Sequence, residues 1–165
     1  MRFHFPASML SGKQTAHLLN PLLPLKPKQE IYTAHCVLLR KKERKIPVAL
    51  IIAGSGPTDR NGNNTMGLQT DVYKMLAHAL SAYGIATVRY DKRGIGASKA
   101  AMKSESDLRF DTYIDDAKDW VKLLKADKRF SGIIIIGHSE GSLIGTNASV
   151  KNVNKFISLA GVAKA

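Results

Sequence analysis

A run of four isoleucines, Ile133–Ile136, is the feature that most restricts how this chain can fold. It is followed at once by Gly-His-Ser-Glu-Gly at 137–141 and then by a segment rich in small residues. A short continuous apolar run bounded by glycine is typical of a strand buried on both faces of a sheet. The chain must therefore place a buried strand, a tight turn and a helix in direct succession.

Segments typical of strands and of helices alternate along the rest of the chain. Apolar runs predict strands at 31–39, 47–53, 85–90, 132–137 and 156–160, and apolar residues at helical spacing predict helices at 72–83, 113–124 and 140–150. Gly84 stands where a C-terminal cap is expected, and Asp111 is predicted to cap the second helix at its N-terminus. This alternation indicates an α/β fold whose mainly parallel sheet carries helices on both faces.

Length and composition suit one globular domain, with 165 residues of which 44% are hydrophobic. Residues 1–30 contain four of the six prolines and no sustained periodicity, so we interpret them as an irregular lead-in to a domain at 31–165. The single cysteine, Cys36, excludes an intramolecular disulfide and is expected to be buried. No segment reaches the ~18 uncharged apolar residues of a membrane span, and no secretory signal is recognisable, so we expect a cytoplasmic protein.

The formal net charge of +12 raises the question of an anionic partner. The lysines and arginines are scattered over predicted turns and polar helix faces, which favours a solvated basic surface. No recognition motif for nucleic acid is present, so neither nucleic acid nor a membrane is expected as a partner. Metal-ligand spacings are also absent from the sequence, and no metal site is predicted.

The pentapeptide at 137–141 fits the pattern G-x-S-x-G between a predicted strand and a predicted helix. In that setting Ser139 occupies a sharp turn that exposes its hydroxyl, while Gly137 and Gly141 leave room for the turn to close against its neighbours. The backbone N–H of Glu140, at the start of the helix, would be one oxyanion donor. The alternative is an ordinary turn from strand to helix. His138 also belongs to the turn, but its side chain should point away from that of Ser139.

A second glycine-rich segment, AGSGPTDR at 53–60, follows another predicted buried strand. Glycines let a backbone approach a substrate closely enough to supply a second oxyanion donor. We expect this donor to be the N–H of Ser55, with the N–H of Gly56 as the neighbouring option. A phosphate-binding loop is the competing interpretation, but the lysine followed by serine or threonine that such a loop requires is missing.

Three segments in this order, GSGPTDRNGN, RYDKRGIGAS and GHSEGSLIG, resemble the core of the alpha/beta-hydrolase superfamily. The nearest branch is that of bacterial carboxylesterases related to serine aminopeptidases. The resemblance runs from about residue 30 to the C-terminus and implies hydrolysis of ester or related acyl bonds, with a small-molecule acyl ester as substrate, through an acyl-enzyme on Ser139 and without a cofactor. It also implies a structural role for Asp91 and Arg93.

The partners that activate a nucleophilic serine are not found in the expected order. In alpha/beta-hydrolases an aspartate or glutamate and then a histidine follow the serine. After Ser139 this chain has only Glu140 and no histidine; His4, His17 and His35 lie early, and His78 falls on a polar helix face. We therefore expect a partial alpha/beta-hydrolase fold that lacks its last strands. The alternative function is an inactive interaction module that self-associates through an uncovered sheet edge or is completed by another chain.

Overall fold

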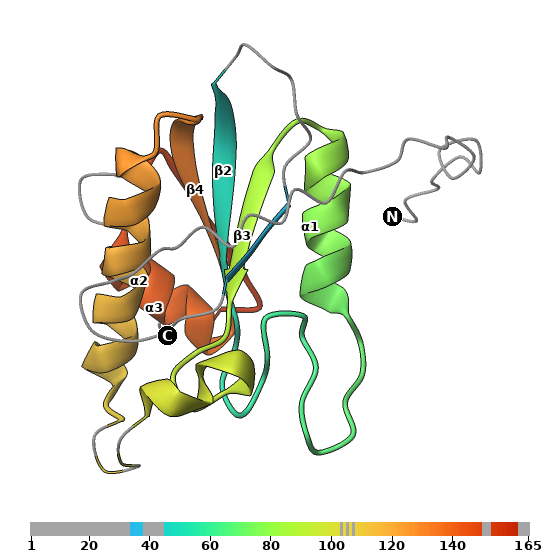
Figure 1. Ribbon diagram of the computed structural model, residues 1–165, viewed down its shortest axis with the longest axis vertical. Helices are drawn as coiled ribbons and strands as arrows, with labels where there is room; N and C mark the ends of the chain where they lie inside the picture. Colours follow the sequence, from blue (N-terminus) through green and yellow to red (C-terminus); the bar gives the residue numbers. More distant parts are fainter. Residues whose placement is uncertain are drawn as a thin grey trace.

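A five-stranded sheet forms the centre of the molecule, as the computed structural model in Figure 1 shows. The structure describes residues 34–37, 45–102, 104, 106, 108–149 and 153–161, with the side chains of 34–37 not included. The strands are β1 (Ala34–Val37), β2 (Ile46–Ile52), β3 (Ala86–Tyr90), β4 (Phe130–His138) and β5 (Lys155–Leu159). The helices are α1 (Val72–Ala82), α2 (Phe110–Ala126), α3 (Glu140–Ala148) and the short 3-10 helix η2 (Gly96–Ala101).

The strands are arranged in the order β1-β3-β2-β4-β5. Strands β3, β2, β4 and β5 run parallel to one another, whereas β1 pairs antiparallel with β3 at the edge. The pairing of β2 with β4 places Ile52 beside Gly137, so both strands end at the same level. The predicted mainly parallel sheet is confirmed, and the carboxyl ends of its central strands meet at one edge, where ligands bind in such folds.

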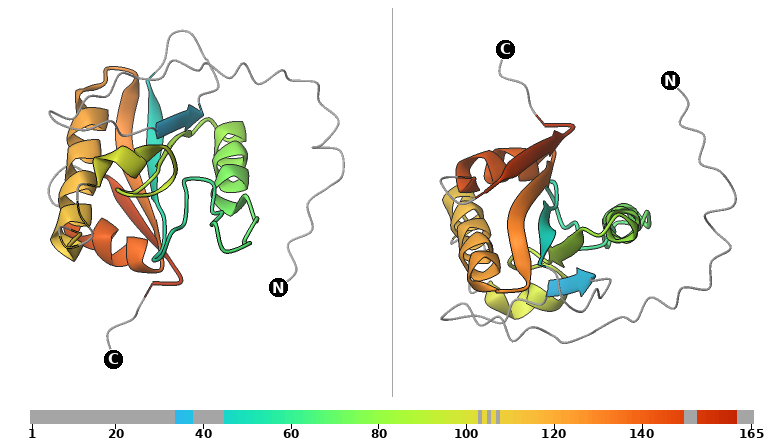
Figure 2. Two further views of the ribbon diagram at one scale, coloured as in Figure 1. Left: turned by 60° about the horizontal axis from the view of Figure 1, so that its bottom comes forward. Right: turned by 90° about the horizontal axis from the view of Figure 1, so that it is seen from above.

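Helices cover both faces of the sheet, as predicted (Figures 1 and 2). One core cluster lies between the sheet and helices α2 and α3, and a second lies under α1. Strand β2 contributes to both, because its side chains alternate: Leu50 and Ile52 belong to the first cluster, and Ala49 and Ile51 to the second. Its continuous apolar sequence is thus explained by burial on both faces.

The end of helix α1 agrees with the sequence prediction, whereas the start of helix α2 differs from it. Helix α1 is followed by Gly84 at φ +75°, the left-handed conformation that favours glycine after a helix. The prediction that Asp111 caps α2 is wrong: α2 begins at Phe110, and the extended residue before it is Arg109. Asp111 lies in the first turn, where its carboxylate still faces the positive end of the helix dipole.

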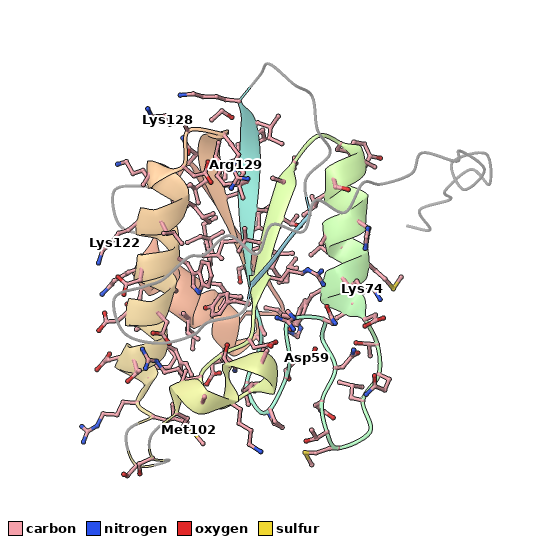
Figure 3. All side chains as sticks on the ribbon, viewed as in Figure 1. Asp59, Lys74, Met102, Lys122, Lys128 and Arg129 are labelled. Atoms are coloured by element: carbon pink, nitrogen blue, oxygen red, sulfur yellow. The ribbon has the colours of Figure 1, made fainter. Side chains whose placement is uncertain are left out.

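Three glycine-bearing loops, which follow β2, β3 and β4 and begin at residues 53, 91 and 139, lie at one end of the molecule, the lower end in Figure 1. Figure 3 labels Asp59 and Met102 at this end, and Lys128 and Arg129 at the opposite end. Lys74 and Lys122 lie on different helices and pair with nearby aspartates. The predicted burial of Cys36 and the predicted lead-in at 1–30 fall outside what the structure describes. Within the described residues, no helix is long and apolar enough to span a membrane.

Candidate active site

Ser139 lies in a strained turn between β4 and α3. Its backbone has φ 51° and ψ −120°, the conformation of the first central residue of a type II′ turn, where glycine is the usual residue. The turn is held by two hydrogen bonds: Ser139 N donates to Leu159 O over 2.9 Å, and Ser142 N donates to Ser139 O over 2.9 Å. Non-glycine residues held in such strained conformations cluster at active sites and ligand-binding sites.

The two glycines of the pentapeptide are required by close backbone contact. A Cβ added to Gly137 would lie 2.3 Å from Gly141 O, and a Cβ added to Gly141 would lie 2.3 Å from Ile52 O. These atoms belong to backbone and cannot turn aside. The expectation that small residues allow the turn to close against its neighbours agrees with this geometry.

The loop after β2 packs against the serine turn. A Cβ added to Gly54 would lie 3.4 Å from Ser139 Cβ, so the two loops are in contact. Ser55 and Gly56 follow and are exposed, and Gly56 has φ +74° with open space around it. No described group accepts a hydrogen bond from the N–H of Ser55 or of Gly56. The loop that contains the predicted donors thus lies against the serine turn, and their N–H groups have no acceptor among the described residues.

Glu140 is the first residue of α3, so its N–H has no acceptor within the helix. Helix α3 begins immediately after Ser139 and directs the positive end of its dipole toward the serine turn. The Glu140 side chain makes a separate contact, since its Oε2 lies 3.3 Å from Lys92 Nζ. The predicted backbone donor and an unpredicted ion pair therefore come from the same residue.

Lys92 is the functional candidate that sequence reasoning missed. Its side chain is only 4% exposed, and Nζ donates to Gly54 O over 2.6 Å as well as to Glu140. The ammonium also lies 5.4 Å from the centre of the Tyr113 ring, a cation–π distance. The one signal in the sequence was its place in DKRGIGAS, immediately after strand β3, at the edge of the sheet where the serine turn lies.

Burial lowers the pKa of Lys92 below its ordinary value of 10.5, while the nearby Glu140 carboxylate works in the opposite direction. Between the lowered pKa and 10.5, the unfolded chain still holds a proton that the folded protein has released. The contribution of Lys92 to the free energy of unfolding therefore rises with pH in this window, by up to about 1.4 kcal/mol per pH unit.

We expect this rise to disappear in Lys92→Met, which cannot titrate at that position. Urea unfolding of both proteins, from neutral pH to about pH 10.5, measures the difference in slope. The exposed variant Lys122→Met is the control, because it removes a lysine whose pKa is raised instead. Equal pH slopes for the wild type and Lys92→Met would contradict the prediction.

His138 is held by a tyrosine rather than by the serine. Its Nδ1 lies 2.8 Å from Tyr73 Oη, and the Tyr73 oxygen also accepts a hydrogen bond from Gly54 N over 3.2 Å. His78 is exposed on α1, as predicted. Among the residues that the structure describes, no histidine bonds to Ser139 Oγ, and the side chains of His4, His17 and His35 lie outside that set.

The DKRGIGAS loop is anchored by two carboxylates. Asp91, 1% exposed, accepts hydrogen bonds from Arg60 N and Ala97 N, and so joins two loops at this end of the sheet. Arg93 makes a two-point contact with Asp116 of α2, through Nε at 2.8 Å and Nη2 at 2.7 Å. These contacts fit the structural role implied for Asp91 and Arg93.

Loop 59–71 is held by side-chain amide and carboxylate oxygens. Asp59 Oδ1 accepts from Asn61 N and Asn63 N, and Asn63 Oδ1 accepts from the backbone N–H groups of residues 70 and 71. Buried Arg89 reaches from β3 to Asn61 Oδ1 over 2.7 Å. Within the described residues, no group of three or more histidine, cysteine, aspartate or glutamate side chains is placed to hold a metal ion.

A mainly parallel sheet between helices, with a strained serine turn at its carboxyl edge, defines the chain as an alpha/beta-hydrolase. Residues 65–164 match the family model described as serine aminopeptidase, S33. This match covers more than half of the chain, which therefore belongs to that family. The predicted superfamily and branch are confirmed.

Three relatives illustrate the likeness. Esterase EstD of Thermotoga maritima is 30% identical over 110 residues, which are 66% of this chain and 25% of that protein. Est1E from Butyrivibrio proteoclasticus, solved with ferulic acid, has a TM-score of 0.61 at 20% identity, covering 79% of this chain and 49% of that one. A serine hydrolase without a lid from Xanthomonas campestris has a TM-score of 0.57 at 22% identity, covering 82% and 62%. The chain thus spans only part of the length of each.

Proposed function

We propose that this chain carries the nucleophile and the oxyanion hole of a serine carboxylesterase that acts on small acyl esters. The observation that carries the proposal is the backbone of Ser139, which is held at a positive φ on the carboxyl edge of the sheet. Membership in a hydrolase family supports it, as does the likeness to an esterase.

In the proposed reaction Ser139 Oγ attacks the ester carbonyl carbon. A C–O bond forms, the carbonyl π electrons move to oxygen, and the N–H groups of Ser55 or Gly56 and of Glu140 stabilise the resulting oxyanion. The intermediate then collapses: the alcohol leaves with the proton given up by the serine, and an acyl-serine remains. Water later releases the acid by the same steps. No cofactor takes part.

We further propose that the acid and the histidine base of this reaction are not supplied by these 165 residues. Ser139 is followed by no aspartate and no histidine, and the described histidines His78 and His138 lie on α1 and against Tyr73. Loss of the base leaves only residual catalysis from the oxyanion hole and substrate binding. We therefore expect slow acylation and slow turnover from this chain alone.

A fluorophosphonate probe tests the nucleophile, because it forms a stable adduct with activated serines. After incubation for hours, peptide mapping by mass spectrometry should find the adduct on Ser139, with hydrolysis of p-nitrophenyl acetate only slightly above the buffer rate. An adduct on another residue, or none, would refute the assignment of Ser139. Turnover at ordinary enzyme rates would refute the absence of the base.

A second candidate function, an interaction module, is favoured by strand β5. It lies at one edge of the sheet, and all five of its residues are exposed, including Phe156, Ile157 and Leu159. An edge strand of this kind can pair with a strand of another chain. We expect size-exclusion chromatography with light scattering to show dimers or larger species; a monomer at all concentrations would count against this function.

We propose a small acyl ester rather than nucleic acid or a membrane as the partner, because the labelled basic side chains Lys74, Lys122 and Lys128 lie on separate parts of the fold (Figure 3). A cytoplasmic location remains a proposal from the sequence. Titration with DNA and RNA at low ionic strength tests the first point, since charge-driven binding is strongest there.

A further inference from the structure

Residues 53–60, which follow β2, are called the oxyanion loop below. Both the N–H and the C=O of Gly54 in this loop are hydrogen-bonded to side chains that also bind the neighbours of Ser139. Its N–H reaches His138 through Tyr73, and its C=O reaches Glu140 through Lys92. His138 and Glu140 are the residues immediately before and after the serine. The oxyanion loop and the serine turn are thus joined by two side chains from elsewhere in the fold.

The first connection runs through Tyr73, a residue of α1 that is 5% exposed. Its oxygen accepts from Gly54 N over 3.2 Å and lies 2.8 Å from His138 Nδ1. An N–H can only donate, so the phenol oxygen is the acceptor there and its own hydrogen is available for Nδ1. The His138 ring stands edge-on to the Tyr73 ring, with 5.8 Å between centroids. Because Tyr73 is buried, losing either bond would leave a polar group without a partner.

The second connection runs through Lys92, which has only buried or partly buried neighbours. Its Nζ donates to Gly54 O over 2.6 Å and lies 3.3 Å from Glu140 Oε2. An ammonium shielded from water binds such partners firmly, because the cost of leaving it unpaired is high. Lys92 therefore holds a carbonyl of the oxyanion loop at a fixed distance from the start of helix α3.

Because the peptide bond is planar, the contact of Lys92 with Gly54 O also orients the N–H of Ser55. Gly54 C=O and Ser55 N–H belong to the same peptide unit, and in a trans peptide they point in opposite directions. A lysine that fixes the carbonyl of this unit also fixes the direction of its N–H. The bond from Lys92 to Gly54 O therefore favours Ser55 over Gly56 as the oxyanion donor, because the Gly56 N–H lies in the next peptide unit.

We propose that Tyr73 and Lys92 are positioning residues, which lock the Gly54–Ser55 peptide to the serine turn and so aim the Ser55 N–H at the oxyanion. This inference rests on the proposed function, since it requires an oxyanion formed at Ser139. Neither side chain needs to touch the substrate. Both act by holding backbone that does, and a displacement of about 1 Å at such a donor can cost a hundredfold in rate.

The experiment measures fluorophosphonate labelling of Ser139 in the full chain. It separates two quantities, the dissociation constant of the non-covalent probe complex and the rate constant of the covalent step. Tyr73→Phe removes one hydroxyl and keeps the ring; Lys92→Met keeps the stem and removes the ammonium. We expect each variant to lower the rate constant of the covalent step by about tenfold or more and to leave the dissociation constant of the probe unchanged, because the oxyanion forms only after the probe is bound.

Matched controls come from the exposed surface. Tyr83→Phe alters a tyrosine that is 74% exposed just after α1, and Lys122→Met alters a lysine of α2 whose side chain is 72% exposed. Both should label like the wild type. Lys92→Arg retains a cation able to donate to Gly54 O, so it should recover part of the rate lost in Lys92→Met. Thermal unfolding of every variant separates a misplaced peptide from a misfolded chain.

The outcomes are distinct. If the wild type is not labelled at Ser139, the proposed function fails and the positioning role falls with it. If the wild type is labelled and both Tyr73→Phe and Lys92→Met react at the wild-type rate while folded, the proposed function stands and the positioning role is overturned. A rise in the dissociation constant of the probe with an unchanged rate constant of the covalent step would also overturn the positioning role, because that result assigns the two residues to ground-state binding.

Discussion

Replacing Ser139 with alanine should abolish fluorophosphonate labelling of the chain, a loss of at least about a hundredfold in adduct formed. The reason is that Oγ is the atom proposed to form the new bond, and alanine retains everything else at the position. Serine and alanine both carry a Cβ at this positive φ, so the strain of the turn is the same in both. Intact-protein mass spectrometry measures the adduct, and the melting temperature should change little.

The control is Ser131→Ala, which makes the same chemical change at an exposed serine near the start of β4, at the opposite end of that strand. It should label like the wild type. Labelling that survives in Ser139→Ala, with a normal melting temperature, would mean that the probe reacts elsewhere. The strained turn would then be a structural feature of the fold and not evidence for a nucleophile.

The fold could be predicted from the sequence because its strands and helices have clear periodicities. Segments such as Ile133–Ile136 are apolar on both sides, and this pattern specifies central strands of a parallel sheet. The order of strands could not be predicted, since periodicity says which segments are strands but not which are neighbours. The antiparallel pairing of β1 with β3 therefore came only from the structure.

The candidate site also contains residues that could be predicted from the sequence and residues that could not. Ser139 and its glycines were recognisable because the turn requires particular residues at fixed spacing, and Ser55 because glycine-rich loops follow the strands. Lys92 and Tyr73 were not recognisable, since each acts through contacts with residues far away in the sequence. The error at Asp111 has a related cause: aspartate is favoured both as a cap and in the first turn, so its presence fixes a helix start only within a residue or two.

Replacing Gly141 with alanine should destabilise the protein by about 3 kcal/mol and remove labelling of Ser139. The added Cβ would lie 2.3 Å from Ile52 O and 2.7 Å from Ala53 O, which are backbone atoms at the end of a central strand. Relief requires β2 and α3 to separate. That movement also shifts Ala53 and the oxyanion loop that follows it, so the geometry around Ser139 is lost even in molecules that remain folded.

Helix propensity alone predicts the opposite change in stability, because alanine is favoured over glycine by about 1 kcal/mol within a helix such as α3. Without the overlap the variant would be more stable than the wild type. Gly84→Ala is the control: it has φ +75° and no atom within 4 Å, so it costs only the strain of a left-handed alanine, about 1 kcal/mol. Urea unfolding compares the two. A Gly141→Ala protein as stable as Gly84→Ala would contradict the prediction that the added Cβ forces β2 and α3 apart.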